Sequence, residues 1–253
     1  MADVLLELRE GVAVLTVDRP AVRNAIGLAT MDALDQALDA AADADVLVLR
    51  GSGDRAFISG GDLKELAKIR TRSEAVAMAL RMRRLCDRVA TFPAPVIAAL
   101  NGHALGGGAE VAVAADIRVA ADDITIGFTQ ATLAIMPAWG GAERLAALAG
   151  RSQALLLTTT GERIGTAEAH RIGLIERVYP RARFEESWRE LARRIAASPS
   201  RPIKSVIARA VPHHHPEHEQ SAAAAFAALW TSDAHWAVVA GEPRSKPAGH
   251  PRE

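Results

Sequence analysis

A run of three glycines, Gly106–Gly108, is the feature of this 253-residue chain that most restricts how it can fold. It stands between a short apolar run, Pro95–Leu100, and a helix-forming run, Ala109–Ala115. Glycines at such a junction allow backbone dihedrals and close approaches that a side chain would block. They also leave the unpaired N–H groups at the start of the helix uncovered. The run Pro95–Leu100 therefore predicts a strand, and the stretch Asn101–Asp116 that follows it predicts a tight turn and a helix whose N-terminus is open to a ligand.

A carboxylate, Glu110, lies in the first turn of this predicted helix. Unpaired N–H groups, with the helix dipole behind them, suit an oxygen that is becoming negative. A carboxylate beside such groups is poorly placed to bind an anion but well placed to transfer a proton or to position water. Two interpretations stay open: an oxyanion site with an acid or base beside it, or a glycine-rich turn with a solvated glutamate.

A second stretch, Ala56–Leu66, has the same build, because Gly60 and Gly61 stand directly before another predicted helix start. Asp62, followed three residues later by Glu65, resembles a capping box with an aspartate in the place of the hydroxyl residue. Two such sites can direct two backbone N–H groups at one oxygen atom, which is how an oxyanion hole is made. The repetition favours this function over two unrelated turns.

The local signals alternate between strands and helices along the whole chain. Thr30 is expected to cap one helix, the tripeptide Trp139-Gly140-Gly141 to open another, and the segment Gln130–Met136 is ambiguous. The main strands are predicted at Gly11–Val17, Val46–Leu49, Pro95–Leu100, Ile117–Ala120, Ile124–Gly127 and Leu174–Tyr179, and the main helices at Ser73–Val89, Ser152–Thr158, Thr166–Ile172 and Phe184–Ala197.

The strongest boundary signal is the segment Ser198–Pro202, which carries two prolines and two serines. It divides a core, residues 1–198, from a helical region, residues 199–240. The apolar surface of the predicted helix Ser221–Trp230 is too large to be left uncovered, so we expect it to pack on the core or on another subunit. The final segment, residues 241–253, is rich in proline and charge and is expected to be disordered.

The composition limits the class of protein. Lys and Arg together number 30, as do Asp and Glu, which gives no support for a nucleic-acid partner. The single Cys86 excludes an internal disulfide framework and fits a reducing compartment. Apolar runs are too short to span a bilayer, and charges within Met1–Glu10 argue against a signal peptide. We therefore expect a cytoplasmic protein with no membrane partner.

No metal or cofactor site is predicted. The segment His213–His218 is rich in histidine, but Pro212 precedes it, Pro216 interrupts it and it lacks regular i,i+4 spacing, so a solvated loop is expected. The run Gly106–Gly108 lacks the spacing and the downstream acid of a dinucleotide-binding fingerprint.

Five pieces of the sequence resemble the enoyl-CoA hydratase/isomerase (crotonase) family, in the same order and at matching spacing. The resemblance implies an α/β fold, in which repeated ββα units wind into a spiral and C-terminal helices form a trimer or a dimer of trimers. It also implies an acyl-CoA thioester as the substrate, coenzyme A only as part of that substrate, no other cofactor, and a place in fatty acid metabolism. The five pieces are Arg23-Asn24-Ala25, Ala56–Leu66, Asn101–Glu110, Pro137–Leu145 and Ala167–Val178.

The resemblance also assigns roles to residues. The backbone N–H groups of Gly61 and Gly107 would form the oxyanion hole that stabilises an enolate. Glu110 matches one of the two glutamates with which hydratases hold the attacking water and move its proton. The substrate and its coenzyme A portion would be bound by Arg23, Ala25, Ser59, Gly60, Gly61, Asp62, Leu63, Lys64, Gly107, Pro137 and Trp139.

The chain departs from the hydratase pattern at Gln130, which stands where the second catalytic glutamate belongs. Glutamine can hydrogen-bond a water molecule but cannot accept its proton. Trp139 also stands where hydratases tend to have a smaller residue, and both differences resemble alkylmalonyl-CoA decarboxylases. Three hypotheses follow: a hydratase-like lyase that depends on Glu110, a decarboxylase or another enolate-forming enzyme, and an acyl-CoA-binding protein with little catalysis.

Overall fold

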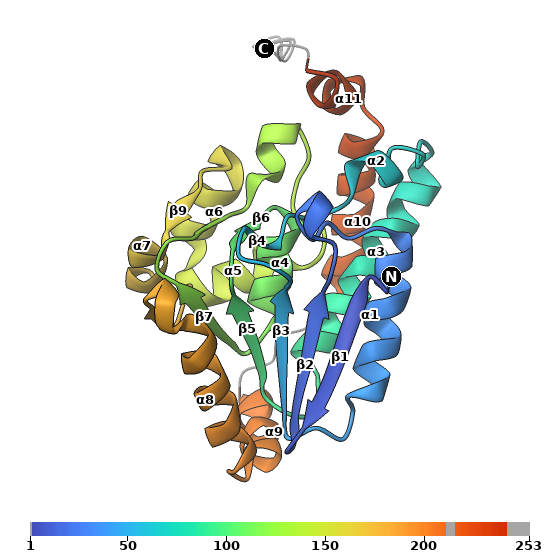
Figure 1. Cartoon of the computed structure of the whole chain (residues 1–253). Coiled ribbons are helices and arrows are strands. Elements are labelled where there is room, and N and C mark those ends of the chain that lie inside the picture. The colour runs from blue at the N-terminus through green and yellow to red at the C-terminus, as the bar shows by residue number, and fades with distance from the viewer. Residues whose placement is uncertain (1, 211–215, 242–253) are drawn as a thin grey trace.

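A unit of two strands and a helix repeats along the chain in the computed structural model, which describes residues 2–210 and 216–241. In each unit the first strand joins a large sheet, the second joins a small sheet, and a helical segment follows (Figure 1). This repetition confirms the predicted ββα spiral. The units are β3 (Val46–Gly51), β4 (Ala56–Ile58), α2 (Leu63–Leu66) and α3 (Arg72–Ala90); β5 (Val96–Leu100), β6 (His103–Leu105) and α4 (Gly107–Ala114); and β7 (Ile117–Ala121), β8 (Thr125–Gly127), the 3-10 helix η2 (Thr129–Leu133) and α5 (Gly141–Ala149).

Within the described residues, the large sheet has the strand order β1-β2-β3-β5-β7-β10 and the small sheet β4-β6-β8-β9. The edge pairs β1–β2 and β8–β9 are antiparallel, and the other pairs are parallel. All five residues of β5 are buried, as expected for a central parallel strand covered on both faces. The remaining strands are β1 (Val4–Arg9), β2 (Val12–Val17), β9 (Ile164–Gly165) and β10 (Arg177–Tyr179).

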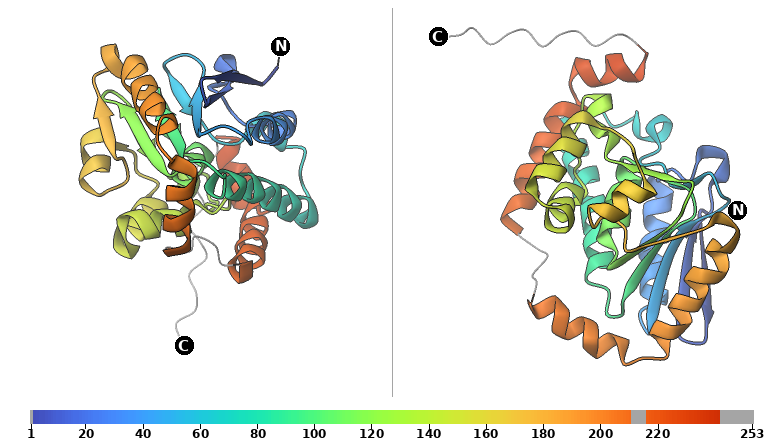
Figure 2. Two further views of the ribbon diagram at one scale, coloured as in Figure 1. Left: turned by 90° about the horizontal axis from the view of Figure 1, so that it is seen from below. Right: turned by 90° about the vertical axis from the view of Figure 1, so that its left-hand side faces the viewer.

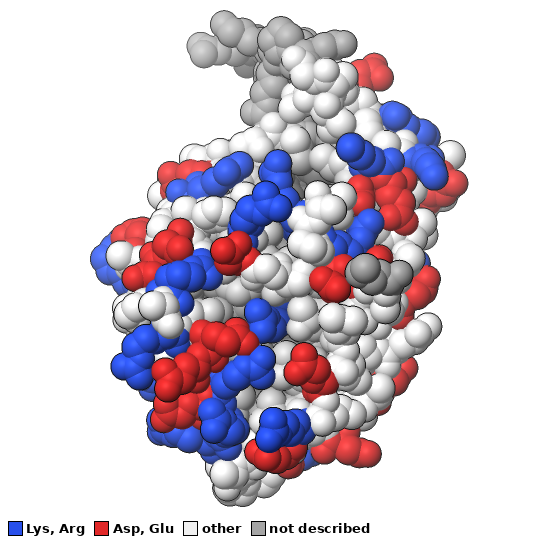
Figure 3. Space-filling view, in the orientation of Figure 1, with Lys and Arg blue, Asp and Glu red and all other residues white. Residues whose placement is uncertain are grey.

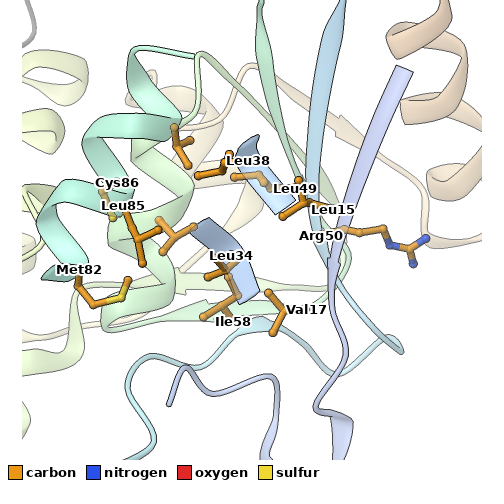
Figure 4. A pocket seen from close by; sticks show the side chains of 12 residues that line it. Leu15, Val17, Leu34, Leu38, Leu49, Arg50, Ile58, Met82, Leu85 and Cys86 are labelled. Atoms are coloured by element: carbon orange, nitrogen blue, oxygen red, sulfur yellow. The ribbon is translucent and has the colours of Figure 1, made fainter. Parts of the chain in front are cut away.

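Helices cover both faces of the large sheet. Figure 2 shows α8 (Phe184–Ala196) on the face opposite to that covered by α1 (Leu28–Ala40) and α3. Between α1, α3 and the sheet lies a cavity of about 30 Å³, into which aliphatic side chains converge while Arg50 points away (Figure 4). This cavity is part of the core. The other described elements are η1 (Pro20–Val22), α6 (Arg151–Thr160), α7 (Thr166–Arg171) and η3 (Arg181–Arg183).

The C-terminal helices are α9 (Ser200–Ala210), α10 (Pro216–Trp230) and α11 (Asp233–Val239). Helix α10 packs against α3, with Phe226 and Trp230 buried, and the indole Nε1 of Trp230 donates to the Ile69 carbonyl at 3.0 Å. Phe226 and Trp230 are therefore covered by the core of the same chain, while Leu229 of this helix stays exposed. The predicted boundary after residue 198 falls in the link between α8 and α9 and stays a prediction. The loop residues 213–215 and nearly all of the predicted tail lie outside the described residues.

Several local predictions were wrong or incomplete. Helix α1 begins two residues before Thr30, with Gly27 as its N-cap, and Thr30 instead accepts a hydrogen bond from the Gly27 N–H. Asp62 caps α2 as predicted, but the Glu65 carboxylate accepts from the Leu28 N–H and so stabilises the start of α1. The strands β1 and β6 and the helix α11 carried no signal strong enough to be predicted.

Charged side chains of both signs are interspersed on the face shown in Figure 3. Most are exposed, but Arg118 on β7 is almost fully buried and joins three parts of the chain. Its guanidinium donates to the Leu174 carbonyl at 2.9 Å and to the Ala115 carbonyl at 2.7 Å, and it pairs with Glu176. Arg118 thereby holds the segment that leads into β10 against the end of α4.

We expect Arg118→Met to lower the free energy of unfolding by about 3–5 kcal/mol, because it leaves buried carbonyls and a carboxylate without their donor. Arg171→Met is the matched control, since Arg171 pairs with Glu168 on the exposed side of α7. It should change the same quantity by less than about 1 kcal/mol. Urea unfolding of both variants measures the difference, and equal effects would contradict this role for Arg118.

Candidate active site

The two glycine turns meet in space, as two successive ββα units bring them to neighbouring positions. A side chain on Gly60, whose φ is +106°, would place its Cβ 3.2 Å from the backbone nitrogen of Gly107. Gly107 is the first residue of α4, so its N–H has no partner within the helix. Among the described residues, the N–H groups of Gly61 and Gly107 have no hydrogen-bond acceptor. Two free backbone donors thus lie on adjacent turns, as the oxyanion hole requires.

The segment around Arg23 lies beside the Gly60–Asp62 turn. The Ile26 N–H donates to the Gly60 carbonyl at 2.8 Å, and the Asp62 N–H donates to the Ile26 carbonyl at 2.9 Å. Arg19 adds a second connection, because its guanidinium donates to the Ala25 carbonyl at 2.6 Å and to the Asp62 carboxylate at 3.1 Å. The structure therefore brings together the two segments that were predicted to bind the coenzyme A portion.

Glu110 is the buried carboxyl group of the site, with 1% of its surface exposed. Its Oε2 accepts from the Trp139 N–H at 2.7 Å and from the Gly141 N–H at 3.0 Å. Its Oε1 accepts from the Gln130 side chain at 2.7 Å and from the Ala138 N–H at 3.4 Å. Burial raises the pKa of Glu110 to about 7, while the surrounding donors lower it in part. Such a group can both take up and release a proton near neutral pH.

Gln130 touches Glu110 from the 3-10 helix η2. Its amide directs the NH₂ group to the carboxyl group, where Nε2 donates to Glu110 Oε1. The Oε1 atom of Gln130 is consequently left buried with no hydrogen-bond partner among the described residues. An unpaired buried acceptor costs free energy unless a ligand or water donates to it.

The turn Trp139–Gly141 lies between Glu110 and Arg144. The N–H groups of Trp139 and Gly141 point to Glu110, while the Trp139 carbonyl accepts from Arg144 at 3.1 Å on the other side. Arg144 is 8% exposed and also pairs with Asp87 on α3. A side chain on Gly141 would place its Cβ 2.3 Å from the Glu110 Cγ. The absence of a side chain there lets the carboxylate reach the start of α5.

The other residues predicted to bind substrate lie around this centre. Pro137 is buried in the segment that leads into the Trp139 turn, and Leu63 is half-buried at the start of α2. Lys64 and Arg23 are exposed, and Arg23 has a left-handed backbone with φ of 57°. The Ser59 hydroxyl donates weakly to the Val22 carbonyl at 3.5 Å. These contacts give the positions of the residues, while their roles in binding stay predictions.

Three residues that shape the site were not predicted: Arg19, Asp87 and Arg144. Each acts through a partner far away in the sequence, as in the pair of Arg144 with Asp87, 57 positions apart. Only Arg144 carried a local signal, since it follows the Gly140-Gly141 pair in the first turn of a predicted helix. No group of histidine, cysteine or acidic residues that could hold a metal ion occurs in the ranges 2–210 and 216–241.

Comparison with known proteins supports the same family as the site does. A family model described as enoyl-CoA hydratase/isomerase matches residues 7–235. The chain belongs to this family. A short-chain-enoyl-CoA hydratase of Clostridium acetobutylicum is 34% identical over 199 residues, a match that covers 78% of this chain and 76% of that protein. A crotonyl-CoA hydratase of Syntrophomonas wolfei is 35% identical over 199 residues, covering 76% and 75% of the two chains.

Solved structures of the enoyl-CoA hydratase/isomerase family have the same fold. The crystal structure of an enoyl-CoA hydratase from Bacillus anthracis superposes with a TM-score of 0.79 at 31% identity, covering 96% of this chain and 98% of that one. The fold, with its two sheets and their ββα repetition, is therefore that of the family. Among the helices that the structure describes, none has the length and apolarity needed to cross a membrane.

The raised pKa of Glu110 predicts a specific dependence of stability on pH. Between about pH 4.5 and 7 the folded chain keeps a proton that the unfolded chain releases, so the free energy of unfolding falls as the pH rises. Glu110→Gln has no such ionisation. From about pH 5 to 8 the free energy of unfolding of the wild type should fall by up to about 3 kcal/mol more than that of the variant. Urea unfolding at several pH values tests this, and parallel pH curves would contradict it.

Proposed function

We propose that this family member is a hydratase-type lyase, which adds water to the double bond of a 2-enoyl-CoA thioester. The observation that carries the proposal is the buried Glu110, with a pKa of about 7, beside two free glycine N–H groups. The names of relatives, among them a short-chain-enoyl-CoA hydratase and a crotonyl-CoA hydratase, support the same reaction. The reaction is redox-neutral and requires no cofactor besides the coenzyme A of the substrate.

The thioester carbonyl oxygen would accept hydrogen bonds from the N–H groups of Gly61 and Gly107. Water then attacks the β-carbon of the enoyl group, the electrons of the double bond move toward the carbonyl, and the oxygen becomes an enolate oxygen. Two preorganised N–H donors stabilise this charge, and each such donor is worth about 2.7–4 kcal/mol in comparable sites. Protonation of the α-carbon restores the carbonyl and gives the 3-hydroxyacyl thioester.

Glu110 would move the proton in both halves of this reaction. It takes a proton from the attacking water and delivers one to the α-carbon, so the carboxylate is regenerated. Glu110 can accept a hydrogen bond from this water, because the longest of its four contacts, from the Ala138 N–H at 3.4 Å, is weak enough to be replaced. Gln130 would hold the same water through its unpaired Oε1 atom. In this scheme Gln130 orients the nucleophile but carries no proton.

The coenzyme A portion would extend from the glycine turns along the neighbouring surface segments. The exposed cations Arg23 and Lys64 flank this path and suit the phosphate groups of the ligand. Ser59, Asp62 and Ala25 lie on the two segments that Arg19 joins, which fixes the geometry of the path.

A paired assay tests the proposed reaction. We expect the wild type to hydrate crotonyl-CoA, followed by the loss of enoyl-thioester absorbance, and not to release carbon dioxide from ethylmalonyl-CoA. Glu110→Gln should reduce kcat by about 10²–10⁴-fold, because the acid–base group is lost. Gln130→Glu, which adds a second carboxyl group, should keep the hydratase activity within about tenfold.

Two other outcomes of this assay would contradict the hydratase proposal. Carbon dioxide release without hydration would show that the enzyme is a decarboxylase and not a hydratase. Binding of acyl-CoA with no turnover of either substrate, and with no effect of Glu110→Gln on affinity, would leave a binding protein. Leu8→Ala serves as a control, since Leu8 lies exposed on β1 and should change neither activity.

We also propose that the chain assembles as a trimer or a dimer of trimers. Helix α9 carries a row of exposed apolar residues, Ile203, Val206 and Ile207, beside a groove of about 530 Å³ between α9 and the core. Contiguous apolar surface of this kind is typical of subunit contacts.

Light scattering should give about three or six times the chain mass of 26.8 kDa. Val206→Asp, at a side chain that is 61% exposed, should shift the mass toward that of the monomer by placing a charge in the contact. Leu8→Asp, at a residue that is 60% exposed on β1, is the matched control and should leave the mass unchanged. A monomeric wild type at micromolar concentration would contradict the assembly.

A further inference from the structure

The indole ring of Trp139 fills the space directly above Gly107. A Cβ atom on Gly107 would lie 2.0 Å from Cζ3 and 2.3 Å from Cη2 of this ring. Gly107 is therefore in van der Waals contact with the indole through its own α-carbon. Trp139 is 7% exposed, so its side chain is packed into the site and does not lie on the surface.

The same ring reaches the second glycine turn. A Cβ atom on Gly61 would lie 3.9 Å from Cζ2 of Trp139 and 2.8 Å from Cδ1 of Leu66. Leu66 is 2% exposed and closes the site from the side of α2. The indole and Leu66 together form an apolar wall along the two residues that carry the free N–H groups.

The backbone of Trp139 cannot retreat from this position without breaking strong contacts. Its N–H donates to Glu110 at 2.7 Å and its carbonyl accepts from Arg144 at 3.1 Å. Arg144 is itself held by Asp87. The space next to the glycines is thus determined by the size and rotamer of the side chain at position 139, since its main chain is fixed from both sides.

A thioester whose oxygen accepts from Gly61 and Gly107, and whose β-carbon comes near Glu110, must run past this ring. We propose that Trp139 is the specificity-determining residue of the site and limits the acyl group to a short chain. The inference rests on the proposed placement of the thioester, but not on the reaction being hydration. An acyl chain of several more carbons has to displace the indole, which removes its contact with Gly107.

The test measures the binding of saturated thioesters, which cannot be hydrated. By titration calorimetry we expect the wild type to bind butanoyl-CoA more tightly than decanoyl-CoA. Trp139→Ala should reduce this preference for the short chain by at least about tenfold, because the opened space accepts the added methylene groups. Trp139→Phe is a smaller change that keeps an aromatic contact on Gly107, so its ratio of the two dissociation constants should lie between those of the wild type and Trp139→Ala. This second variant keeps the test valid if the alanine variant does not fold.

The matched control is Trp188→Phe, which alters a fully buried tryptophan on α8, outside the site. It should leave the ratio of the two dissociation constants unchanged. An unchanged ratio in both Trp139 variants, or an equal change in the Trp188 variant, would overturn the inference.

Turnover separates this inference from the proposed function. If the binding preference changes as expected while no variant hydrates crotonyl-CoA or 2-decenoyl-CoA, the hydratase proposal fails and the role of Trp139 stands. If the wild type hydrates crotonyl-CoA but the preference does not change, the hydratase proposal stands and the role of Trp139 fails. If both hold, the ratio of kcat/KM for 2-decenoyl-CoA to that for crotonyl-CoA should rise by at least about tenfold in Trp139→Ala.

Discussion

The hydrogen bonds that end on the Glu110 carboxylate are the interaction on which the site depends. An ionised carboxylate is costly to bury, and backbone donors at the start of α5 and the Gln130 amide offset part of that cost. The donors all follow β8, whereas Glu110 lies on α4 after β6, so they meet only when successive units of the spiral pack together. Burial and hydrogen bonding act on the pKa in opposite directions, and burial prevails.

The repetition of the ββα unit explains how the two halves of the site come together. Successive units place equivalent turns side by side, so the Gly60–Gly61 turn after β4 and the Gly106–Gly107 turn after β6 become neighbours. The third unit contributes the segment from η2 to α5, which supplies Gln130 and the donors to Glu110. Three successive ββα units thus provide a pair of backbone donors and hold a carboxyl group beside them.

Glycine turns and apolar runs made much of this fold predictable, since β5, α3 and the start of α5 carry strong local signals. The strand β6 escaped prediction because its residues, His103–Leu105, include no β-branched side chain. Helix α1 begins earlier than predicted because Gly27, not Thr30, caps it. At the site, the sequence predicted the glycines, Glu110 and Gln130. It could not predict Arg144, whose role depends on Asp87 and on the Trp139 carbonyl, contacts that arise only when distant segments pack.

The turn at Trp139 assigns two tasks to different parts of one residue. Its main chain holds Glu110, and any amino acid except proline supplies the same N–H group. Its side chain only occupies the space beside Gly107. Mutation at this position can therefore change which ligands fit while the acid keeps its hydrogen bonds, so that the choice of substrate can evolve separately from the chemistry.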